Sequence, residues 1–235
     1  MKIEGSRMLI TGGGTGIGRA LAEEATQRGA RVAICGRRSE PLEEVAAATG
    51  AVPLVCDVAD QGAVEAMVGA ASEALGGTPQ ALINNAAFGH RARLLDLESS
   101  AFEAVLRTNV LGAFHVGQAV ARRMVADGAG GSILNIGSSA ARKGYPTGSA
   151  YAASKFALAG LTECWRAELR PHDVRVMQIN PSEVLTEFAA RSGRVQEDNP
   201  TKLHAEDIAH AIVAMLEMND RGFTTELTVF ATNPR

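Results

Sequence analysis

The sequence has few of the features that mark a protein for nucleic acid, membranes or disulfides. Only 4% of its 235 residues are aromatic, and 26 acidic residues nearly balance 23 lysines and arginines, for a net charge of −3. No basic block suggests binding to nucleic acid, and no acidic tail suggests disorder. We therefore expect no nucleic-acid partner.

Cysteine is scarce as well. Cys35, Cys56 and Cys164 are far apart and form no CxxC pair, which argues against disulfides and a zinc site and fits a reducing compartment. The first residues, MKIEGSR, lack the apolar stretch of a signal peptide, and no apolar run approaches the roughly eighteen residues of a membrane span. We expect a cytoplasmic protein without a membrane partner. The five histidines have no metal-ligand spacing, so we expect no metal.

The chain does contain a regular alternation of short apolar runs and helical patterns. Most of the apolar runs are continuous and rich in branched residues, as expected for strands covered on both faces. Strands are predicted at 7–11, 31–35, 52–56, 81–84, 132–137, 174–180 and 226–230, and helices at 16–28, 39–48, 60–75, 99–107, 109–126, 150–169 and 205–217. The alternation indicates an α/β fold in which βαβ units build a parallel sheet with helices on both faces.

Residue types at the helix ends support these boundaries. Ser39 and Asp60 are predicted N-caps, and Gly29 and Gly50 are predicted C-terminal stops. The least regular stretch, 182–204, is long for a connection without structure, so we expect a mobile lid or a partial helix there.

A glycine-rich turn, TGGGTGIGRA, joins the first strand to the first helix. Gly12, Gly16 and Gly18 leave no Cβ between the backbone and a pyrophosphate, and the start of the helix favours an anion. The position of this loop, directly after a strand and opening a helix, predicts a dinucleotide site. After the second strand, Gly36 stands where an acidic residue would bind the ribose of NAD, and arginines follow it.

The two arginines set the predicted cofactor preference. Arg37 and Arg38 could bind a 2′-phosphate, which favours NADP(H) over NAD(H), although either could also be a solvated charge. Asp57 and the adjoining Val58 could hold an adenine ring, or Asp57 could cap a turn. The amides of Asn84 and Asn85 could tie neighbouring strand ends together.

Tyr151 and Lys155 stand four residues apart in YAASK, so on a helix both side chains can face one space. A free phenol has a pKa near ~10, and a neighbouring ammonium lowers it, which makes tyrosine a usable acid or base. Ser138 could hold a carbonyl or alcohol oxygen at the same place. Because the motif is short, a partly buried tyrosine beside a surface lysine is the alternative that the rest of the chain must decide.

With these residues in order, the chain resembles the short-chain dehydrogenase/reductase family over nearly its whole length. The matches are TGGGTGIG at 11–18, Asp57, NNAA at 84–87, Asn109, Ser138, Tyr151 and Lys155. The resemblance implies a single NAD(P)-binding domain over 1–235, a Rossmann-type doubly wound parallel sheet of about seven strands, with a substrate lid at about 182–204.

The resemblance also implies a catalytic tetrad. In it Ser138 positions the substrate oxygen and Tyr151 transfers its proton. Lys155 holds the nicotinamide ribose and lowers the Tyr151 pKa, while Asn109 keeps a water in a relay to Lys155. The implied cofactor contacts are Gly12, Thr15, Gly16, Ile17, Gly18, Arg37, Arg38, Asp57, Val58, Asn85, Ala86, Tyr151, Lys155, Pro181, Val184 and Thr186.

The sequence departs from the family pattern at three places. Ala87 replaces the last glycine of NNAG, and Ser182 replaces the glycine that commonly follows Pro181. The ending TELTVFATNPR lacks the glycines usual in acyl-carrier-protein reductases.

We expect an NADP(H)-dependent oxidoreductase of a ketone or secondary alcohol, similar to 3-oxoacyl-(acyl-carrier-protein) reductase-like members, with a 3-oxoacyl thioester as the favoured substrate. A steroid, pterin or secondary-metabolite ketone, or a non-catalytic NADP-sensing protein, are the alternatives. The expected pocket is mostly apolar, lined by Phe88, Leu94, Leu95, Tyr145, Val184, Leu185 and Phe188. Helices 109–126 and 150–169 carry an excess of apolar and small residues, and in the family such helices build dimers and tetramers, so we expect a homo-oligomer, dimer or homotetramer.

Overall fold

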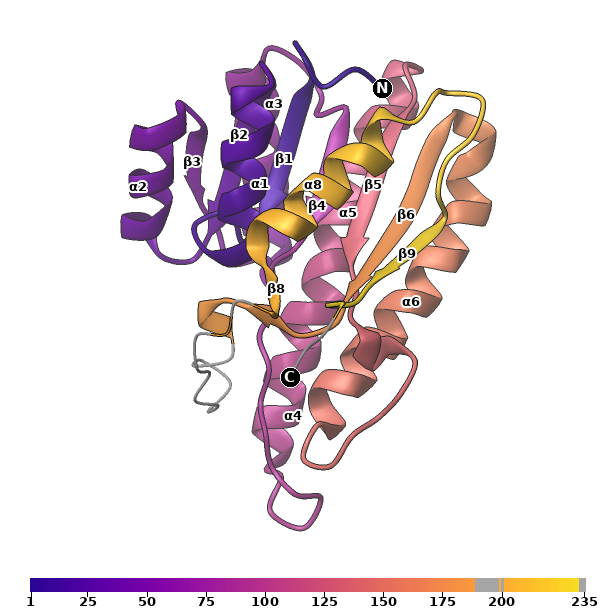
Figure 1. The fold of residues 1–235 in the computed structure, drawn as a ribbon. Helices are drawn as coiled ribbons and strands as arrows, with labels where there is room; N and C mark the ends of the chain where they lie inside the picture. Colours follow the sequence, from indigo (N-terminus) through magenta and orange to yellow (C-terminus); the bar gives the residue numbers. More distant parts are fainter. Residues whose placement is uncertain (189–198, 200, 233–235) are drawn as a thin grey trace.

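The computed structural model describes residues 1–188, 199 and 201–232. Strands and helices alternate along these residues (Figure 1). The strands are β1 (Arg7–Thr11), β2 (Arg31–Gly36), β3 (Val52–Val55), β4 (Ala81–Asn84), β5 (Gly131–Ile136), β6 (Val174–Pro181), β7 (Val184–Leu185), β8 (Leu203–His204) and β9 (Glu226–Val229). The α-helices are α1 (Gly16–Gln27), α2 (Ser39–Thr49), α3 (Gln61–Leu75), α4 (Ser99–Leu106), α5 (Ala113–Asp127), α6 (Ser149–Leu169) and α8 (Ala205–Glu217). Three short turns of other helix types are η1 (Arg107–Gly112), η2 (Ser139–Ala141) and η3 (Arg170–His172).

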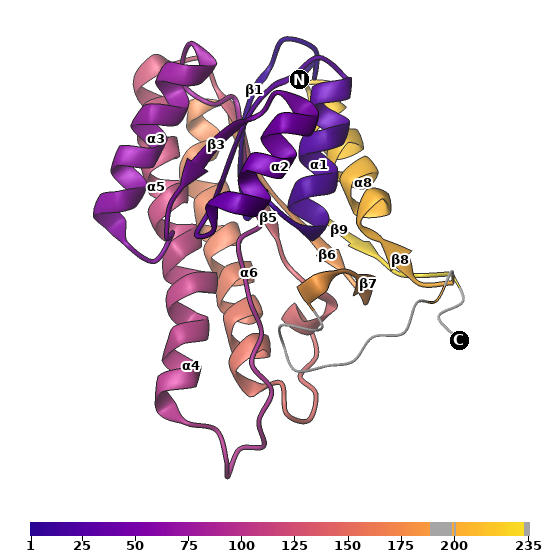
Figure 2. The same ribbon diagram turned by 90° about the vertical axis from the view of Figure 1, so that its left-hand side faces the viewer.

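Seven strands form one parallel sheet in the order β3-β2-β1-β4-β5-β6-β9. Helices cover both faces of this sheet (Figures 1 and 2). Because side chains alternate along a strand, Met8 and Ile10 of β1 join the core beneath α1, α2 and α8, whereas Leu9 joins the core beneath α3, α5 and α6. The predicted doubly wound sheet is therefore confirmed.

The predicted boundaries agree with the observed ones within a few residues, with two exceptions. Ser39 is the first residue of α2 and Arg38 holds the N-cap position, so the predicted cap was wrong. The helix predicted at 109–126 begins as the π-helical turn η1 and continues as α5. The other cap, Asp60, is confirmed, because its carboxylate accepts from the Ala63 N–H at 2.9 Å.

The strand order leaves an opening at the carboxyl ends of the central strands. The chain runs from β1 outward to β3 and then crosses to β4 on the other side of β1, so the strand order reverses there. Ligands of such sheets bind at the carboxyl ends of the strands beside the reversal. The parallel pair β7 and β8 belongs to the region predicted as a lid. The part of that prediction covering 189–198 and 200 lies outside the described residues.

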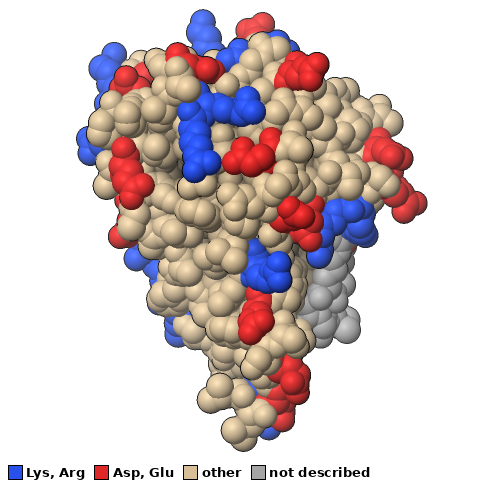
Figure 3. Space-filling model, turned by 180° about the vertical axis from the view of Figure 1, so that it is seen from behind, with Lys and Arg blue, Asp and Glu red and all other residues tan. Residues whose placement is uncertain are grey.

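The surface carries charges of both signs. On the side turned away from the viewer in Figure 1, lysine and arginine are interspersed with aspartate and glutamate across a mostly uncharged surface (Figure 3). In the described part of the chain, no helix is long and apolar enough to cross a membrane.

Candidate active site

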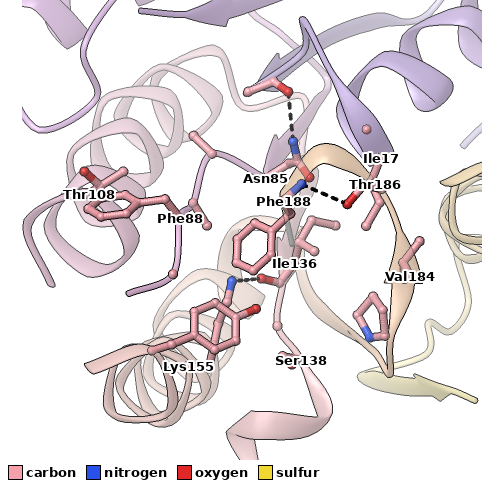
Figure 4. A pocket seen from close by; sticks show the side chains of 18 of the residues that line it. Ile17, Asn85, Phe88, Thr108, Ile136, Ser138, Lys155, Val184, Thr186 and Phe188 are labelled. Carbon is pink, nitrogen blue, oxygen red and sulfur yellow. Dashed lines mark hydrogen bonds between the residues drawn. The ribbon is translucent and has the colours of Figure 1, made fainter. Parts of the chain in front are cut away.

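A cavity of about 1080 Å³ lies at the carboxyl ends of the strands (Figure 4). Of the predicted catalytic residues, Ser138, Tyr151 and Lys155 line it. The predicted cofactor residues on its wall are Gly12, Thr15, Gly16, Ile17, Arg37, Arg38, Asp57, Val58, Asn85, Ala86, Tyr151, Lys155, Pro181, Val184 and Thr186. The cavity thus joins residues from opposite ends of the sequence.

The turn between β1 and α1 tolerates almost no side chain. Gly12 and Gly16 have φ of +65° and +54°, a region that L residues rarely adopt. Gly18 is not on the cavity wall, and a Cβ there would lie 2.3 Å from the Gly12 carbonyl oxygen, so this glycine lets α1 pack against the loop. The N-cap, Thr15, makes no side-chain cap bond. The first N–H groups of α1 therefore have no side-chain partner at the cap, as in an anion site.

Side chains at the end of β4 hold this loop in place, as predicted. The Asn85 Nδ2 donates to the carbonyl oxygens of Thr11 and Gly12 at 2.9 and 3.1 Å. The Thr11 hydroxyl accepts from the N–H groups of Asn85 and Ala86. Beside them Asn84 is buried and donates to Asn135 Oδ1 at 2.9 Å, which ties β4 to β5.

The ends of β2 and β3 form the far wall of the cavity. Arg37 and Arg38 are exposed there, and Gly36 puts no side chain between them and the cavity. Asp57 accepts from the Ala59 N–H at 3.0 Å, so one oxygen stabilises a turn and the other is available to a ligand. Val58 is buried beneath this wall. Both residues line the cavity, where a base could bind.

Ser138, Tyr151 and Lys155 meet on the opposite side. Lys155 is only 3% exposed, its ammonium donates to the Ile136 carbonyl at 2.6 Å, and it lies 5.6 Å from the centroid of the Tyr151 ring. Ser138 lines the cavity together with Tyr151, and its side chain lowers the pKa of the Tyr151 phenol. The ring of Phe188 packs near that of Tyr151, with 5.4 Å between centroids. Figure 4 shows Ser138, Lys155 and Phe188 around this part of the cavity.

Burial disfavours the charged forms of both titratable groups. It raises the pKa of the Tyr151 phenol above its usual value, and the Ser138 side chain acts in the opposite direction. Burial also lowers the pKa of Lys155, from 10.5 to about 8. That Lys155 lowers the Tyr151 pKa stays a prediction, since its ammonium is directed at the Ile136 carbonyl.

Asn109 is buried in the π-helical turn η1 and does not line the cavity. Its amide exchanges two hydrogen bonds with the backbone of Phe88, accepting at 3.0 Å and donating at 2.9 Å. It also donates to the Ser154 hydroxyl, which in turn donates to the Tyr151 carbonyl oxygen. Asn109 thus links the segment after β4 to the helix that carries Tyr151. π-turns of this kind often mark functional sites.

The cavity wall is mostly apolar, as expected, but it also carries polar and charged side chains that the sequence did not predict. Phe88, Tyr145, Val184 and Phe188 line the cavity as expected, but Leu94, Leu95 and Leu185 do not. Leu94 and Leu95 are 79% and 94% exposed. Polar and aromatic residues that sequence reasoning missed include Ser139, His90, Arg91, Thr108, Arg142, Lys143, Glu183, Glu187 and Phe230. The run ARKGY at 141–145, which begins three residues after Ser138, was the available signal for part of this wall.

The site fits a dinucleotide. The cradle of positive-φ glycines, the uncapped start of α1 and the arginines after β2 supply space and positive charge for phosphates. In the described ranges, no group of three or more His, Cys, Asp or Glu side chains is placed to hold a metal ion. His115 instead contacts the Val58 carbonyl oxygen through Nδ1 at 3.2 Å.

A doubly wound sheet, a dinucleotide cradle at its strand reversal and a serine, tyrosine and lysine beside that cradle define the class of Rossmann-type oxidoreductases. Comparison with known proteins narrows this class. The model of the short chain dehydrogenase family matches residues 6–197, and the chain belongs to that family. The resemblance inferred from the motifs is therefore confirmed.

Relatives of this chain include reductases of several substrates. It is 37% identical to D-erythrulose reductase of Gallus gallus over 203 residues, 86% of this chain and 79% of that protein. It is 32% identical to "Carbonyl reductase [NADPH] 2" of Sus scrofa over 235 residues, 96% and 93% of the two chains. The crystal structure of 3-ketoacyl-(acyl-carrier-protein) reductase from Brucella melitensis complexed with NADH is similar with a TM-score of 0.89 and 27% identity, over 98% of each chain.

Proposed function

We propose that this protein is an NADP(H)-dependent reductase that interconverts a small hydroxylated ketone and its secondary alcohol. The observation that carries the proposal is the convergence of Ser138, Tyr151 and Lys155 on a cavity whose other end is the glycine cradle. A bound nicotinamide cofactor would supply or accept the hydride. The residues of this chain would bind the substrate oxygen and move its proton.

Each polar residue has a role in this proposal. Ser138 would hold the substrate oxygen beside the Tyr151 hydroxyl, and Tyr151 would donate or accept the proton. Lys155 would bind the cofactor ribose and, as an ammonium, favour the phenolate form of Tyr151. Asn109 would order the backbone of Phe88 and a water that leads towards Lys155.

A hydroxylated ketone fits the cavity better than the 3-oxoacyl thioester favoured by the sequence. The substrate end presents Ser139, His90, Arg91 and Lys143, which can donate hydrogen bonds to substrate hydroxyls. The relation to D-erythrulose reductase supports the same class. The thioester remains the second candidate, because Phe188 and Phe230 offer apolar surface and the chain is similar to a 3-ketoacyl reductase.

The preference for NADP(H) rests on the wall after β2. Arg37 and Arg38 line it, and no carboxylate follows that strand directly to repel a 2′-phosphate. The name of the porcine relative supports the same cofactor. A ratio of kcat/KM for NADPH over NADH above one is expected, and a ratio below one would overturn this part of the proposal.

The decisive experiment follows NADPH oxidation with two groups of substrates, ketoses such as erythrulose and short 3-oxoacyl thioesters. We expect turnover of the ketoses, with the Tyr151→Phe variant losing nearly all activity while it still binds NADPH. A variant with unchanged turnover would refute the role of Tyr151. NADPH binding without turnover of any carbonyl would favour the cofactor-sensing alternative.

Two further expectations belong to this proposal. Leu111 of η1 and Phe156 of α6 are 47% and 48% exposed, which supports a homo-oligomer built from η1, α5 and α6. A monomeric mass by light scattering at micromolar protein would contradict it. The segment 182–204 would act as a substrate lid, since its described residues Val184, Thr186 and Phe188 line the cavity.

A further inference from the structure

A chain of buried polar side chains runs across the carboxyl ends of β4, β5 and β6. Asn84 donates to Asn135, and Asn135 donates to the Thr162 hydroxyl at 2.8 Å. That hydroxyl has two acceptors for its single proton, the Leu158 carbonyl oxygen at 2.7 Å and Gln178 Oε1 at 3.0 Å. Gln178 Nε2 then donates to Asn180 Oδ1 at 2.7 Å. Burying this many amides is costly unless they are paired; in this group, Asn84 Oδ1 is buried without a hydrogen-bond partner.

Asn180 is the end of this chain nearest to the reacting groups. It is fully buried, and its Oδ1 accepts from the Ser138 backbone N–H at 3.2 Å as well as from Gln178. Its Nδ2 donates to a carboxylate oxygen of Glu226 on β9. With two donors on the oxygen and a carboxylate on the nitrogen, the amide has only one favourable orientation.

The backbone beside Ser138 fits closely around this amide. A Cβ on Gly137 would lie 2.0 Å from Asn180 Oδ1, so the glycine allows β5 to approach the amide. On the outer side, the guanidinium of Arg142, which lines the cavity, binds both oxygens of Glu226. An unbroken set of contacts therefore runs from the cavity wall through Glu226 and Asn180 to Ser138.

We propose that Asn180, held in its orientation by Glu226, is a positioning residue that fixes Ser138 against Tyr151 during the reaction. Asn180 is too deeply buried to touch a substrate and acts through the Ser138 backbone. This inference rests on the proposed function, because it assigns a task to the Ser138 hydroxyl. The Ser138 side chain lowers the Tyr151 pKa, so losing the position of Ser138 should move the pH dependence as well as the rate.

The first test exchanges the amide and the carboxylate of the Asn180–Glu226 pair. Asn180→Asp places two carboxylates face to face, and we expect kcat to fall by at least about tenfold, because small misplacements near a reacting centre cost that much or more. In the double variant Asn180→Asp with Glu226→Gln, the amide introduced on β9 donates to the carboxylate introduced on β6. Total charge is then unchanged, and kcat should recover most of the loss. Asn219→Asp, the same change at an exposed site, is the matched control.

The second test separates positioning from charge and does not depend on the stability of Asn180→Asp. Glu226→Ala removes the acceptor of Asn180, whereas Glu226→Gln keeps an acceptor oxygen. If Glu226 acted only by its charge, its loss would move the limb of the kcat profile for alcohol oxidation to lower pH, since phenolate would become easier to form. If Glu226 acts by positioning Asn180, the Glu226→Ala variant should show this limb of the kcat profile at higher pH. The Glu226→Gln variant, which keeps an acceptor oxygen, should show no shift of the limb to higher pH.

Different results would contradict the positioning role of Asn180 and the proposed function. A double variant as impaired as Asn180→Asp, or a limb at lower pH in Glu226→Ala, would overturn the positioning role while leaving the proposed function intact. Failure of the proposed function would show separately, as Tyr151→Phe activity equal to that of the unchanged protein. Recovery in the double variant, together with the upward limb, would establish the role.

Discussion

Replacing Lys155 by methionine should stabilise the protein at neutral pH while it removes turnover. Burial lowers the pKa of this 3% exposed lysine from 10.5 to about 8, which corresponds to about 3 kcal/mol against the charged form. Methionine is of similar length and brings no charge. It does leave the Ile136 carbonyl without the lysine donor, at a cost of about 1–2 kcal/mol. We expect the free energy of unfolding to rise by about 1–2 kcal/mol at pH 7.

A sharper test is how the difference in unfolding free energy between Lys155→Met and the unchanged protein depends on pH. Below pH 8 the lysine is charged in the native and the unfolded chain, so the full penalty acts on the native state. Between about 8 and 10.5 the native lysine loses its proton first, and the penalty shrinks as pH rises. The stability advantage of Lys155→Met should therefore fall by about 2 kcal/mol between about pH 7 and about pH 9.5.

The measurement is urea unfolding of both proteins, without cofactor, across this pH range. Taking the difference between the two proteins cancels the titration of all other groups. Lys143→Met, which makes the same change at an exposed lysine, is the matched control. If the difference for Lys155→Met were constant with pH, the reasoning from burial would be wrong.

Two more substitutions test close packing. Gly18→Ala would put a Cβ 2.3 Å from the Gly12 carbonyl oxygen, so NADPH affinity measured by fluorescence titration should weaken about tenfold or more; unchanged affinity would contradict the close approach of α1 to the loop. Gly117→Ala would put a Cβ 2.8 Å from the Trp165 ring and should lower the free energy of unfolding by about 1–3 kcal/mol. Gly160→Ala, a helical glycine with nothing within 4 Å of its Cβ position, should not destabilise the protein in the same urea experiment.

Local patterns predicted the elements and the motifs well. Continuous apolar runs located each strand of the large sheet, and the four-residue spacing of Tyr151 and Lys155 placed both in α6. The glycines after β1 identified the cradle because the ability to adopt a positive φ without strain is a property of glycine itself. The prediction of Ser39 as the N-cap was wrong, because α2 begins at Ser39 itself and Arg38 holds the N-cap position.

Contacts between distant segments could not be predicted. The apolar pocket was only partly right, because Leu94 and Leu95 follow an apolar pattern yet lie on an exposed loop. The tasks of Asn109 depend on Phe88 and Ser154, which are 21 and 45 residues away. No periodicity of the sequence carries such information.

The sequence by itself determined an α/β chain with a dinucleotide cradle and a tyrosine and lysine on one helical face, because these features depend on residues at most a few positions apart. Only the tertiary structure decided that Ser138 meets Tyr151, that polar groups line the substrate end, and that Asn180 joins Ser138 to Glu226. Ser138 and Asn180 are 42 residues apart and Asn180 and Glu226 are 46. Such pairs come together only because β5, β6 and β9 are neighbours in the sheet, and that order is set by the packing of the whole domain.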